Sequence, residues 1–383
     1  MTAVAASAAA DGAIPAALDE LLTVRDFETA ARGRLEPVYY DYVAGGARDE
    51  VTVRANEEGF EQLSLLPRVL RGNTKRDVSV SLFGSRASMP VLISPTAFHR
   101  LFCAEGEVAT ARAAARADTI MIASMASTVA VAQVAAAARA AVPDREPGLW
   151  FQLYLQPDHE DTAALVRRAA EAGCTALVVT VDSPVLGANE RNRRNHFHDL
   201  PAGMHCENLR NLRGDEPGNV RQIAMSAALT WDDVDRLREH TALPIILKGV
   251  LHPEDAKSAV AHGVDGLLLS NHGGRQLDTA PSTIELLPEF VREVGDEIPV
   301  LLDGGIRRGT DIVKALALGA AAVGIGRPIV WGLAVGGEQG AVRVLETLRE
   351  ELDHTLALCG VDGFADLSPA LVRARPGSAG RAR

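Results

Sequence analysis

Eight short apolar segments alternate with helical stretches between residues 89 and 327 of this 383-residue chain. Apolar runs of this length are typical of buried strands, and eight strand and helix units in succession predict an α/β fold built as a closed (β/α)8 TIM barrel. An open doubly wound sheet is the main rival; it predicts a glycine-rich dinucleotide turn after an early strand, and the sequence has none. The predicted strands are 90–97, 119–124, 149–154, 176–182, 244–250, 266–272, 299–305 and 322–327.

The stretches that flank and interrupt this pattern differ in character. A helical pattern over residues 23–56 predicts an N-terminal helical extension, and about forty residues between the fourth strand and Thr230 predict a long lid or binding loop. We expect residues 1–22 to form a disordered leader and residues 368–383 a loose tail. The chain is therefore expected to hold one domain, residues 23–367.

Charge and cysteine content argue against several classes of function. A net charge of −11 and a pI near 5.4 disfavour nucleic acid and membrane surfaces as partners, because both require a basic face. The four cysteines stand far apart, which supports neither a zinc ribbon nor a disulfide framework. Because the sequence shows no secretory signal and no apolar run long enough to span a bilayer, we expect a cytoplasmic protein.

Polar residues stand at the carboxyl ends of the predicted strands, which in such a barrel meet at one mouth. Lys248 directly follows an apolar strand and needs an anionic partner there, because an unpaired ammonium is costly to desolvate. A site is therefore expected at this mouth. The strand-end residues are Thr96, Ala97, Ser124, Gln152, Tyr154, Thr180, Asp182, Lys248, Ser270, His272, Asp303, Gly305, Gly326 and Arg327.

The stretch Ser270-Asn-His-Gly-Gly-Arg-Gln-Leu-Asp278 places an imidazole and a guanidinium three residues apart beside two glycines. The glycines allow positive φ and a close approach of the backbone to a ligand. The alternative is a polar loop whose histidine caps a helix. The polar residues at the neighbouring strand ends favour a site containing His272 and Arg275.

The last two strands end in Asp303-Gly-Gly-Ile-Arg307 and Gly324-Ile-Gly-Arg327. Barrels commonly hold a phosphate here through glycine amides, and two arginines add charge-assisted hydrogen bonds. The alternative is a pair of tight turns with surface arginines. We expect a phosphorylated cofactor or substrate, and the spacing does not say which.

Together these motifs resemble those of the FMN-dependent 2-hydroxy acid oxidase and dehydrogenase family. The resemblance rests on the 270–278 stretch with Leu247-Lys-Gly-Val250, Leu302-Asp-Gly-Gly-Ile-Arg-Arg-Gly309 and Ile325-Gly-Arg-Pro328. Ser94-Pro-Thr-Ala97, Phe151-Gln-Leu-Tyr154 and Thr180-Val-Asp-Ser-Pro184 follow the order of that family. The match spans roughly residues 23–367. It implies FMN as cofactor and oxidation of an α-hydroxy acid to the 2-oxo acid.

The resemblance also implies a role for each residue. His272 would be the base that takes a proton from the substrate, with a hydride equivalent passing to flavin N5; Asp182 would stabilise the imidazolium and Arg275 would hold the substrate carboxylate. Lys248 would favour the anionic reduced flavin, and Tyr42 and Tyr154 would reach the substrate. The flavin and its phosphate would contact Thr96, Ala97, Ser124, Gln152, Thr180, Ser270, Asp303, Gly305, Arg307, Gly326 and Arg327.

Three positions depart from the family pattern. Relatives usually carry an arginine where Asn189 stands, as a second clamp on the carboxylate, and an aspartate where Asn192 stands. Either Arg191 or Arg193 takes over this contact through a shifted loop, or the substrate lacks an ordinary α-hydroxy carboxylate. Ala126 stands where relatives often have an aromatic residue, which predicts a larger pocket and a substrate bulkier than glycolate or lactate.

Other functions remain open at this stage. The loop residues His196, His198, His205 and Cys206 suggest a metal site, but they lack a helical i, i+4 frame, and we expect no metal. Rival functions are oxidation of an amine or another biosynthetic intermediate, an FMN-barrel isomerase, and a non-catalytic FMN-binding barrel. Partners are expected to be a small-molecule substrate, O2 or another electron acceptor, and copies of the chain in a homotetramer. The sequence does not separate oxidase, dehydrogenase and monooxygenase.

Overall fold

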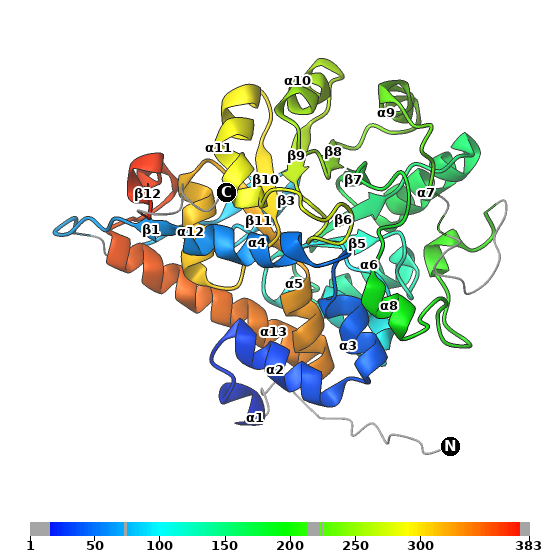
Figure 1. Ribbon diagram of the computed structural model, residues 1–383, viewed down its shortest axis with the longest axis horizontal. Coiled ribbons are helices and arrows are strands. Elements are labelled where there is room, and N and C mark those ends of the chain that lie inside the picture. Colours follow the sequence, from blue (N-terminus) through cyan, green and yellow to red (C-terminus); the bar gives the residue numbers. More distant parts are fainter. Residues whose placement is uncertain (1–15, 73–74, 213–222, 224, 376–383) are drawn as a thin grey trace.

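Eight parallel strands close into a barrel in the computed structural model, which describes residues 16–72, 75–212, 223 and 225–375. Each strand pairs with the next along the chain, and the last pairs with the first. The predicted (β/α)8 barrel is confirmed (Figure 1). The barrel strands are β4 (Val91–Ile93), β5 (Ile120–Ser124), β6 (Gly148–Leu153), β7 (Leu177–Thr180), β8 (Ile245–Lys248), β9 (Gly266–Leu269), β10 (Val300–Asp303) and β11 (Ala322–Ile325).

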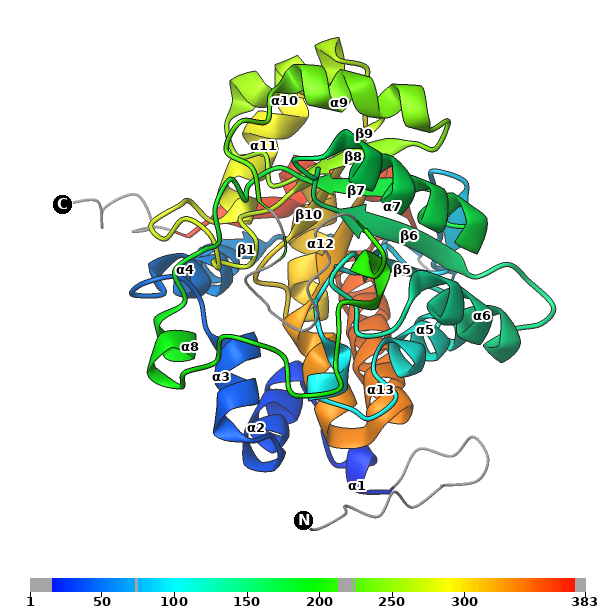
Figure 2. The ribbon, with the colours of Figure 1, turned by 90° about the vertical axis from the view of Figure 1, so that its right-hand side faces the viewer.

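A helix follows each barrel strand and packs on the outside of the ring (Figures 1 and 2). The last of these helices is much longer than the others and bends at Gly336 and Gly337, which have non-helical backbone angles. The outer helices are α5 (Glu107–Arg116), α6 (Val131–Ala141), α7 (His159–Ala172), α9 (Trp231–Leu237), α10 (Pro253–Ala261), α11 (Thr283–Val294), α12 (Gly309–Ala317) and α13 (Arg327–Cys359).

Side chains that alternate along the strands divide the core into two layers, because successive residues of a strand point to opposite faces. One set fills the barrel interior, where Phe83 from the hairpin of β2 (Val80–Leu82) and β3 (Ser85–Ala87) meets Trp150 edge-on with ring centres 5.4 Å apart. The other set faces the outer helices and belongs to the larger apolar cluster. The barrel is therefore packed with side chains, and its carboxyl end remains for a site.

The predicted N-terminal helical extension is confirmed as α2 (Val24–Arg34), α3 (Pro37–Ala44) and α4 (Val51–Glu61). Helix α2 begins with a capping box in which Thr23 and Asp26 exchange hydrogen bonds. Its residues Val24, Phe27 and Ala31 are fully buried, and α2 packs against α13. Figures 1 and 2 both show α2 and α3 below the barrel beside α13.

Both ends of the described chain pack on the barrel, which the sequence pattern does not predict. Residues 16–19 form α1 (Ala16–Asp19), whose Leu18 is buried against α13. Residues 369–374 form the 3-10 helix η6 (Pro369–Leu371) and β12 (Val372–Ala374), which pairs antiparallel with β1 (Leu63–Leu65). Backbone hydrogen bonding to β1 and burial of Leu371 explain this order. The rest of the expected leader and tail, residues 1–15 and 376–383, lies outside the described residues.

The long loop predicted after the fourth strand is present. It contains α8 (Glu190–Arg194) and the 3-10 helix η2 (Glu207–Leu209), and it ends at the capping box of Thr230 and Asp233 that starts α9. Helix α8 lies beside α3 (Figure 2). Residues 213–222 and 224 lie outside the described residues. Among the described helices, none is long and apolar enough to cross a membrane.

Candidate active site

A cavity of about 400 Å³ opens at the carboxyl ends of the barrel strands and brings most of the predicted site residues together. Several are the last residues of their strands, as expected for this fold. Asp182 and Ser270 do not line the cavity but contact residues that do. The predicted residues that line it are Tyr42, Thr96, Ala97, Ser124, Gln152, Tyr154, Thr180, Lys248, His272, Arg275, Asp303, Gly305, Arg307, Gly326 and Arg327.

His272 follows β9 in a strained turn. Its own φ is +59°, and Gly273 and Gly274 also have positive φ, so the backbone doubles back within three residues. The backbone N–H of His272 donates to Oγ of Ser270 at 3.1 Å. Nδ1 of His272 lies 2.9 and 3.1 Å from the two carboxylate oxygens of Asp182. With Nδ1 donating to Asp182, Nε2 is left as the nitrogen that can accept a proton.

Asp182 is held as a carboxylate behind His272. Burial alone would raise its pKa, but the charge and hydrogen bond of His272, assisted by Lys248 and Ser183, lower it to about 2. Oγ of Ser183 donates to Asp182 at 2.9 Å. A carboxylate that stays ionised fixes the imidazole tautomer and favours the imidazolium.

Replacing Asp182 with asparagine should therefore reduce stability in a pH-dependent way. Because folding lowers the pKa from 3.8 to about 2, we expect a loss of about 2 kcal/mol near pH 6. The carboxylate contribution is complete above the unfolded pKa of 3.8 and disappears as the pH falls to the folded pKa. Urea unfolding of both proteins at several pH values should show the difference shrinking from about pH 4 to 2. A difference independent of pH would contradict this assignment.

Lys248 is buried at the end of β8 and has polar partners at the ends of two other strands. Its Nζ donates to Oγ of Ser270 at 2.9 Å and lies 3.8 Å from a carboxylate oxygen of Asp303. Ser94 also donates to Asp303, at 3.0 Å. The anionic partner predicted for Lys248 is thus Asp303, and the pair stands at the cavity wall.

The ends of β5, β6 and β7 carry a connected row of polar side chains. Oγ of Ser124 donates to Oε1 of Gln152 at 3.0 Å, and Nε2 of Gln152 donates to Thr180 at 3.1 Å. All three side chains are buried and line the cavity. This fixes the Gln152 amide, so the row presents a rigid polar surface to a planar ligand.

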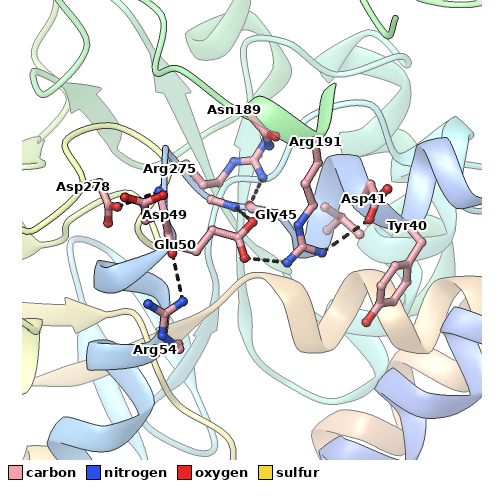
Figure 3. A network of polar contacts seen from close by, with 12 residues as sticks. Tyr40, Asp41, Gly45, Asp49, Glu50, Arg54, Asn189, Arg191, Arg275 and Asp278 are labelled. Carbon is pink, nitrogen blue, oxygen red and sulfur yellow. Dashed lines mark hydrogen bonds and ion pairs between the residues drawn. The ribbon is translucent and has the colours of Figure 1, made fainter. Parts of the chain in front are cut away.

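Arg275 is anchored to the N-terminal extension. Its Nη1 donates to the backbone carbonyls of Tyr42 at 2.7 Å and Gly45 at 2.9 Å, and its Cζ lies 5.0 Å from the centre of the Tyr42 ring. Figure 3 shows this guanidinium beneath Asn189, next to Glu50. The extension therefore positions Arg275, and the nitrogens other than Nη1 remain for a ligand at the cavity.

Two further contacts tie α4 to the predicted motif. Asp278 accepts hydrogen bonds from the backbone of Thr52 at 2.9 Å and Asp49 at 3.0 Å. Asn271 and Asn56 exchange side-chain hydrogen bonds of 2.7 and 2.9 Å. Asn271 and Asp278 of the 270–278 stretch thus support the site instead of lining it, whereas Gln276 lines the cavity with His272 and Arg275.

The structure decides how Arg191 is used. Its guanidinium pairs with Glu50 and lies 3.4 Å from Asp41, as Figure 3 shows, and it does not line the cavity. Arg193 lines the cavity but is exposed. Asn189 caps α8 by accepting from the backbone N–H of Asn192 at 3.1 Å. Arg191 therefore supports the extension and stands outside the cavity that Asn189 lines.

The end of the cavity at the carboxyl ends of β10 and β11 suits a phosphate. Gly304 and Gly305 have positive φ, and a Cβ on Gly305 would stand 2.1 Å from the carbonyl oxygen of Asn56. Helix α13 begins at Arg327 in the same wall, and helix N-termini favour anions. Burial, with Arg275 and Arg307 nearby, lowers the pKa of Arg327 to about 9. This crowding of cations indicates a site for an anion.

Orphaned polar atoms give an independent test of that fit. Oδ1 of Asp303 and Nε of Arg307 are buried without a hydrogen-bond partner among the described residues. Buried polar atoms are normally paired, so a ligand with hydroxyl and phosphate groups would satisfy both. The residues at this end therefore fit a phosphorylated, hydroxyl-bearing cofactor.

Several aromatic side chains of the site were not predicted. The Tyr42 ring contacts Phe98, Phe102 and Phe197, with ring centres 5.8, 6.4 and 5.3 Å apart. The sequence does not distinguish Phe98, Phe102 and Phe197 from phenylalanines that only pack in the core, so their place at the site could not be predicted.

Burial raises the pKa of Tyr42 to about 12, and burial and Asp182 raise that of Tyr154 further. Both phenols are therefore neutral hydrogen-bond donors at physiological pH.

The loop histidines do not assemble into a metal site in the described part of the chain. No group of three or more His, Cys, Asp or Glu side chains suited to a metal occurs among the residues 16–72, 75–212, 223 and 225–375. The rings of His196 and His198 lie 6.4 Å apart, edge to face.

The chain is similar to known flavin-dependent oxidoreductases in sequence and in structure. The family model described as FMN-dependent dehydrogenase matches residues 31–374. L-lactate oxidase of Nostoc sp. is 43% identical, covering 93% of this chain and 99% of the relative. The peroxisomal (S)-2-hydroxyacid oxidase of Arabidopsis thaliana is 44% identical, covering 93% and 97%. A structure of mandelate oxidase with benzoyl-formic acid superposes with a TM-score of 0.83 at 39% identity, covering 92% and 98%.

Proposed function

The chain belongs to the FMN-dependent 2-hydroxy acid oxidase family, and we propose that within it the enzyme oxidises a substrate bulkier than lactate, with His272 as base. Its cofactor is FMN, and its reaction is oxidation of a 2-hydroxy acid. The observation that carries the proposal is the His272–Asp182 pair at 2.9 Å, in the same cavity wall as Arg275.

The residues that would hold FMN follow from the geometry. Its phosphate would bind at the glycine turn after β10 and the N-terminus of α13, with Arg307 and Arg327. Asp303 would accept from a ribityl hydroxyl through its orphaned oxygen. When bound, FMN would supply the two-electron acceptor for oxidation at the substrate's α-carbon. The flavin rings would contact Thr96, Ala97, Ser124, Gln152, Thr180 and Lys248.

The side chains then divide the work of substrate binding and proton transfer. Arg275 binds the substrate headgroup through the guanidinium nitrogens that the extension leaves free. His272 takes the substrate's proton on Nε2 while Asp182 holds the opposite nitrogen and stabilises the resulting imidazolium. Tyr42 and Tyr154 stay protonated and donate hydrogen bonds. Lys248 places a positive charge where negative charge grows on the reduced cofactor.

The wall at Ala126 supports the proposed size of the substrate. Ala126 lines the cavity and offers only a methyl group, and apolar Phe98 and Phe102 line the same cavity. An aromatic ring would find apolar contacts there. A mandelate oxidase structure with the aryl ligand benzoyl-formic acid supports this choice, because its chain superposes on this one along almost its whole length.

A substrate panel tests the proposal. With purified holoenzyme, we expect kcat/KM for mandelate to exceed that for glycolate by about tenfold or more, because a buried phenyl group adds apolar contact. Ala126→Phe should reverse this order by filling the space. The measurement is anaerobic bleaching of the flavin with glycolate, lactate, mandelate, amino acids and amines. Equal turnover of small and bulky acids would contradict the size proposal, and bleaching only by amines would overturn the hydroxy-acid proposal.

The electron acceptor and the assembly are further proposals. We propose O2 as acceptor, because the relatives at 43% and 44% identity are named oxidases. A cytoplasmic location stays a prediction, since one relative is named as peroxisomal. The homotetramer also stays a prediction.

A further inference from the structure

Two side-chain amides beside the substrate headgroup site lack partners. Nδ2 of Asn189 and Oδ1 of Asn192 are buried and make no hydrogen bond with any described residue, and both side chains line the cavity. Because Oδ1 of Asn189 accepts the N–H of Asn192 at 3.1 Å, the orientation of the Asn189 amide is fixed and its free atom is a donor. The wall thus offers one unpaired donor and one unpaired acceptor.

Most cations near this wall are committed to other groups. Arg191 is neutralised by Glu50 and Asp41 and does not line the cavity, while Arg193 is exposed, where solvent screens its charge. Arg327 donates to the Gly45 carbonyl that Arg275 also uses, and in the proposed function it binds the phosphate. Arg275 is left for the headgroup, with one nitrogen already given to two backbone carbonyls. A carboxylate only accepts hydrogen bonds. It would therefore leave Oδ1 of Asn192 unpaired and facing the negative charge of the carboxylate oxygens. A headgroup with both a donor and an acceptor would satisfy both amides.

We propose that the headgroup site accepts neutral 2-hydroxy carboxamides as substrates, with their C=O bound by Arg275 and Asn189 and their NH2 by Asn192. This inference rests on the proposed function, because the chemistry at the α-carbon is the same. The 2-hydroxy amide loses its hydroxyl proton to His272 and two electrons with the α-hydrogen to FMN, giving the 2-oxo amide. When bound, FMN would supply the acceptor for these two electrons, and O2 would take them with two protons to give hydrogen peroxide.

The test compares 2-hydroxy-2-phenylacetamide with mandelate on the same holoenzyme. We expect kcat/KM for the amide to be no more than about tenfold below that for the acid, because the neutral headgroup keeps its hydrogen bonds. Binding of the products, 2-oxo-2-phenylacetamide and benzoyl-formate, is measured separately by titration of the flavin absorbance. The dissociation constants should show the same ratio. A larger preference for the acid in both measurements overturns the inference.

Three variants identify the residues responsible. Asn189→Arg should shift the acid-to-amide ratio toward the acid by about 10- to 100-fold, because it adds a charge-assisted bond. Asn192→Leu should shift the acid-to-amide ratio of kcat/KM toward the acid by about tenfold, since it removes the acceptor for the amide NH2. The matched control for Arg193→Gln is Arg194→Gln, because Arg194 pairs with Glu190 and does not line the cavity. Loss of acid turnover in Arg193→Gln alone would show that Arg193 holds a carboxylate and would overturn the inference.

The outcomes separate this inference from the proposed function. Rapid oxidation of the acid with none of the amide defeats the inference and leaves the hydroxy-acid function intact. Bleaching by neither substrate, in protein that contains FMN, defeats both. Oxidation of the amide at a rate comparable to the acid, lost in Asn192→Leu, supports the inference.

Discussion

His272→Gln should slow reduction of the bound flavin by hydroxy acid by about 10²- to 10⁴-fold, the usual contribution of a general base. Glutamine keeps a polar side chain of similar length but cannot take the substrate's proton at neutral pH. The flavin should stay bound, because the His272 side chain bonds to Asp182 and is not among the groups expected to hold the phosphate, which are Arg307, Arg327 and the glycine turn after β10. Rapid-mixing absorbance under anaerobic conditions measures the rate, and the flavin-to-protein absorbance ratio measures occupancy.

The companion variants show whether Asp182 acts through His272. Asp182→Asn should slow reduction less than His272→Gln, and the double variant should be no slower than His272→Gln alone, because both side chains form one unit. His159→Gln, which changes an exposed histidine on α7, is the matched control and should reduce at the wild-type rate. Unchanged bleaching in His272→Gln would remove His272 from the role of base. If the losses in reduction rate of the two single variants multiply in the double variant, Asp182 acts independently of His272.

The barrel could be predicted from sequence because each strand is a short apolar run that ends in a polar residue. The same regularity places Ser124, Thr180, Lys248 and Asp303 at one mouth, and the structure shows all four lining one cavity. His272 and Arg275 were predictable because glycines and charged residues directly after a buried strand have few structural explanations. Local pattern was therefore sufficient wherever the barrel itself positions the side chain.

Contacts of the N-terminal extension were beyond the reach of sequence patterns. Arg275 is held by the backbone carbonyls of Tyr42 and Gly45. Every residue has a backbone carbonyl, so the sequence does not show which of them bind Arg275. The Glu50–Arg191 pair joins segments about 140 residues apart, and it depends on how α4 and α8 dock. The sequence therefore left Arg191 and Arg193 as equal candidates for the missing clamp. Only the docking shows that Arg191 belongs to the support of the extension.

Arg327→Met should weaken FMN binding by about 10- to 100-fold while changing riboflavin binding by less than tenfold, because a charge-assisted bond to the phosphate is lost. Burial lowers the pKa of Arg327 to about 9, with a further contribution from Arg275 and Arg307, so a bound dianion relieves an existing repulsion. Apoprotein titrated with FMN and with riboflavin, followed by quenching of flavin fluorescence, gives both constants. Arg308→Met, which changes an exposed neighbour paired with Glu351, is the matched control.

The comparison of the two flavins separates phosphate binding from support of the fold. Arg327 also donates to the carbonyls of Val43 at 3.0 Å and Gly45 at 3.1 Å, so methionine loosens the extension as well. Loosening would weaken both flavins equally, because they share the ring system, whereas loss of the phosphate contact affects FMN alone. Inorganic phosphate should accordingly raise the melting temperature of the wild-type apoprotein and not that of Arg327→Met. Equal losses for FMN and riboflavin would place the role of Arg327 in holding Val43 and Gly45, and the phosphate would then depend on Arg307 and the glycine turn after β10.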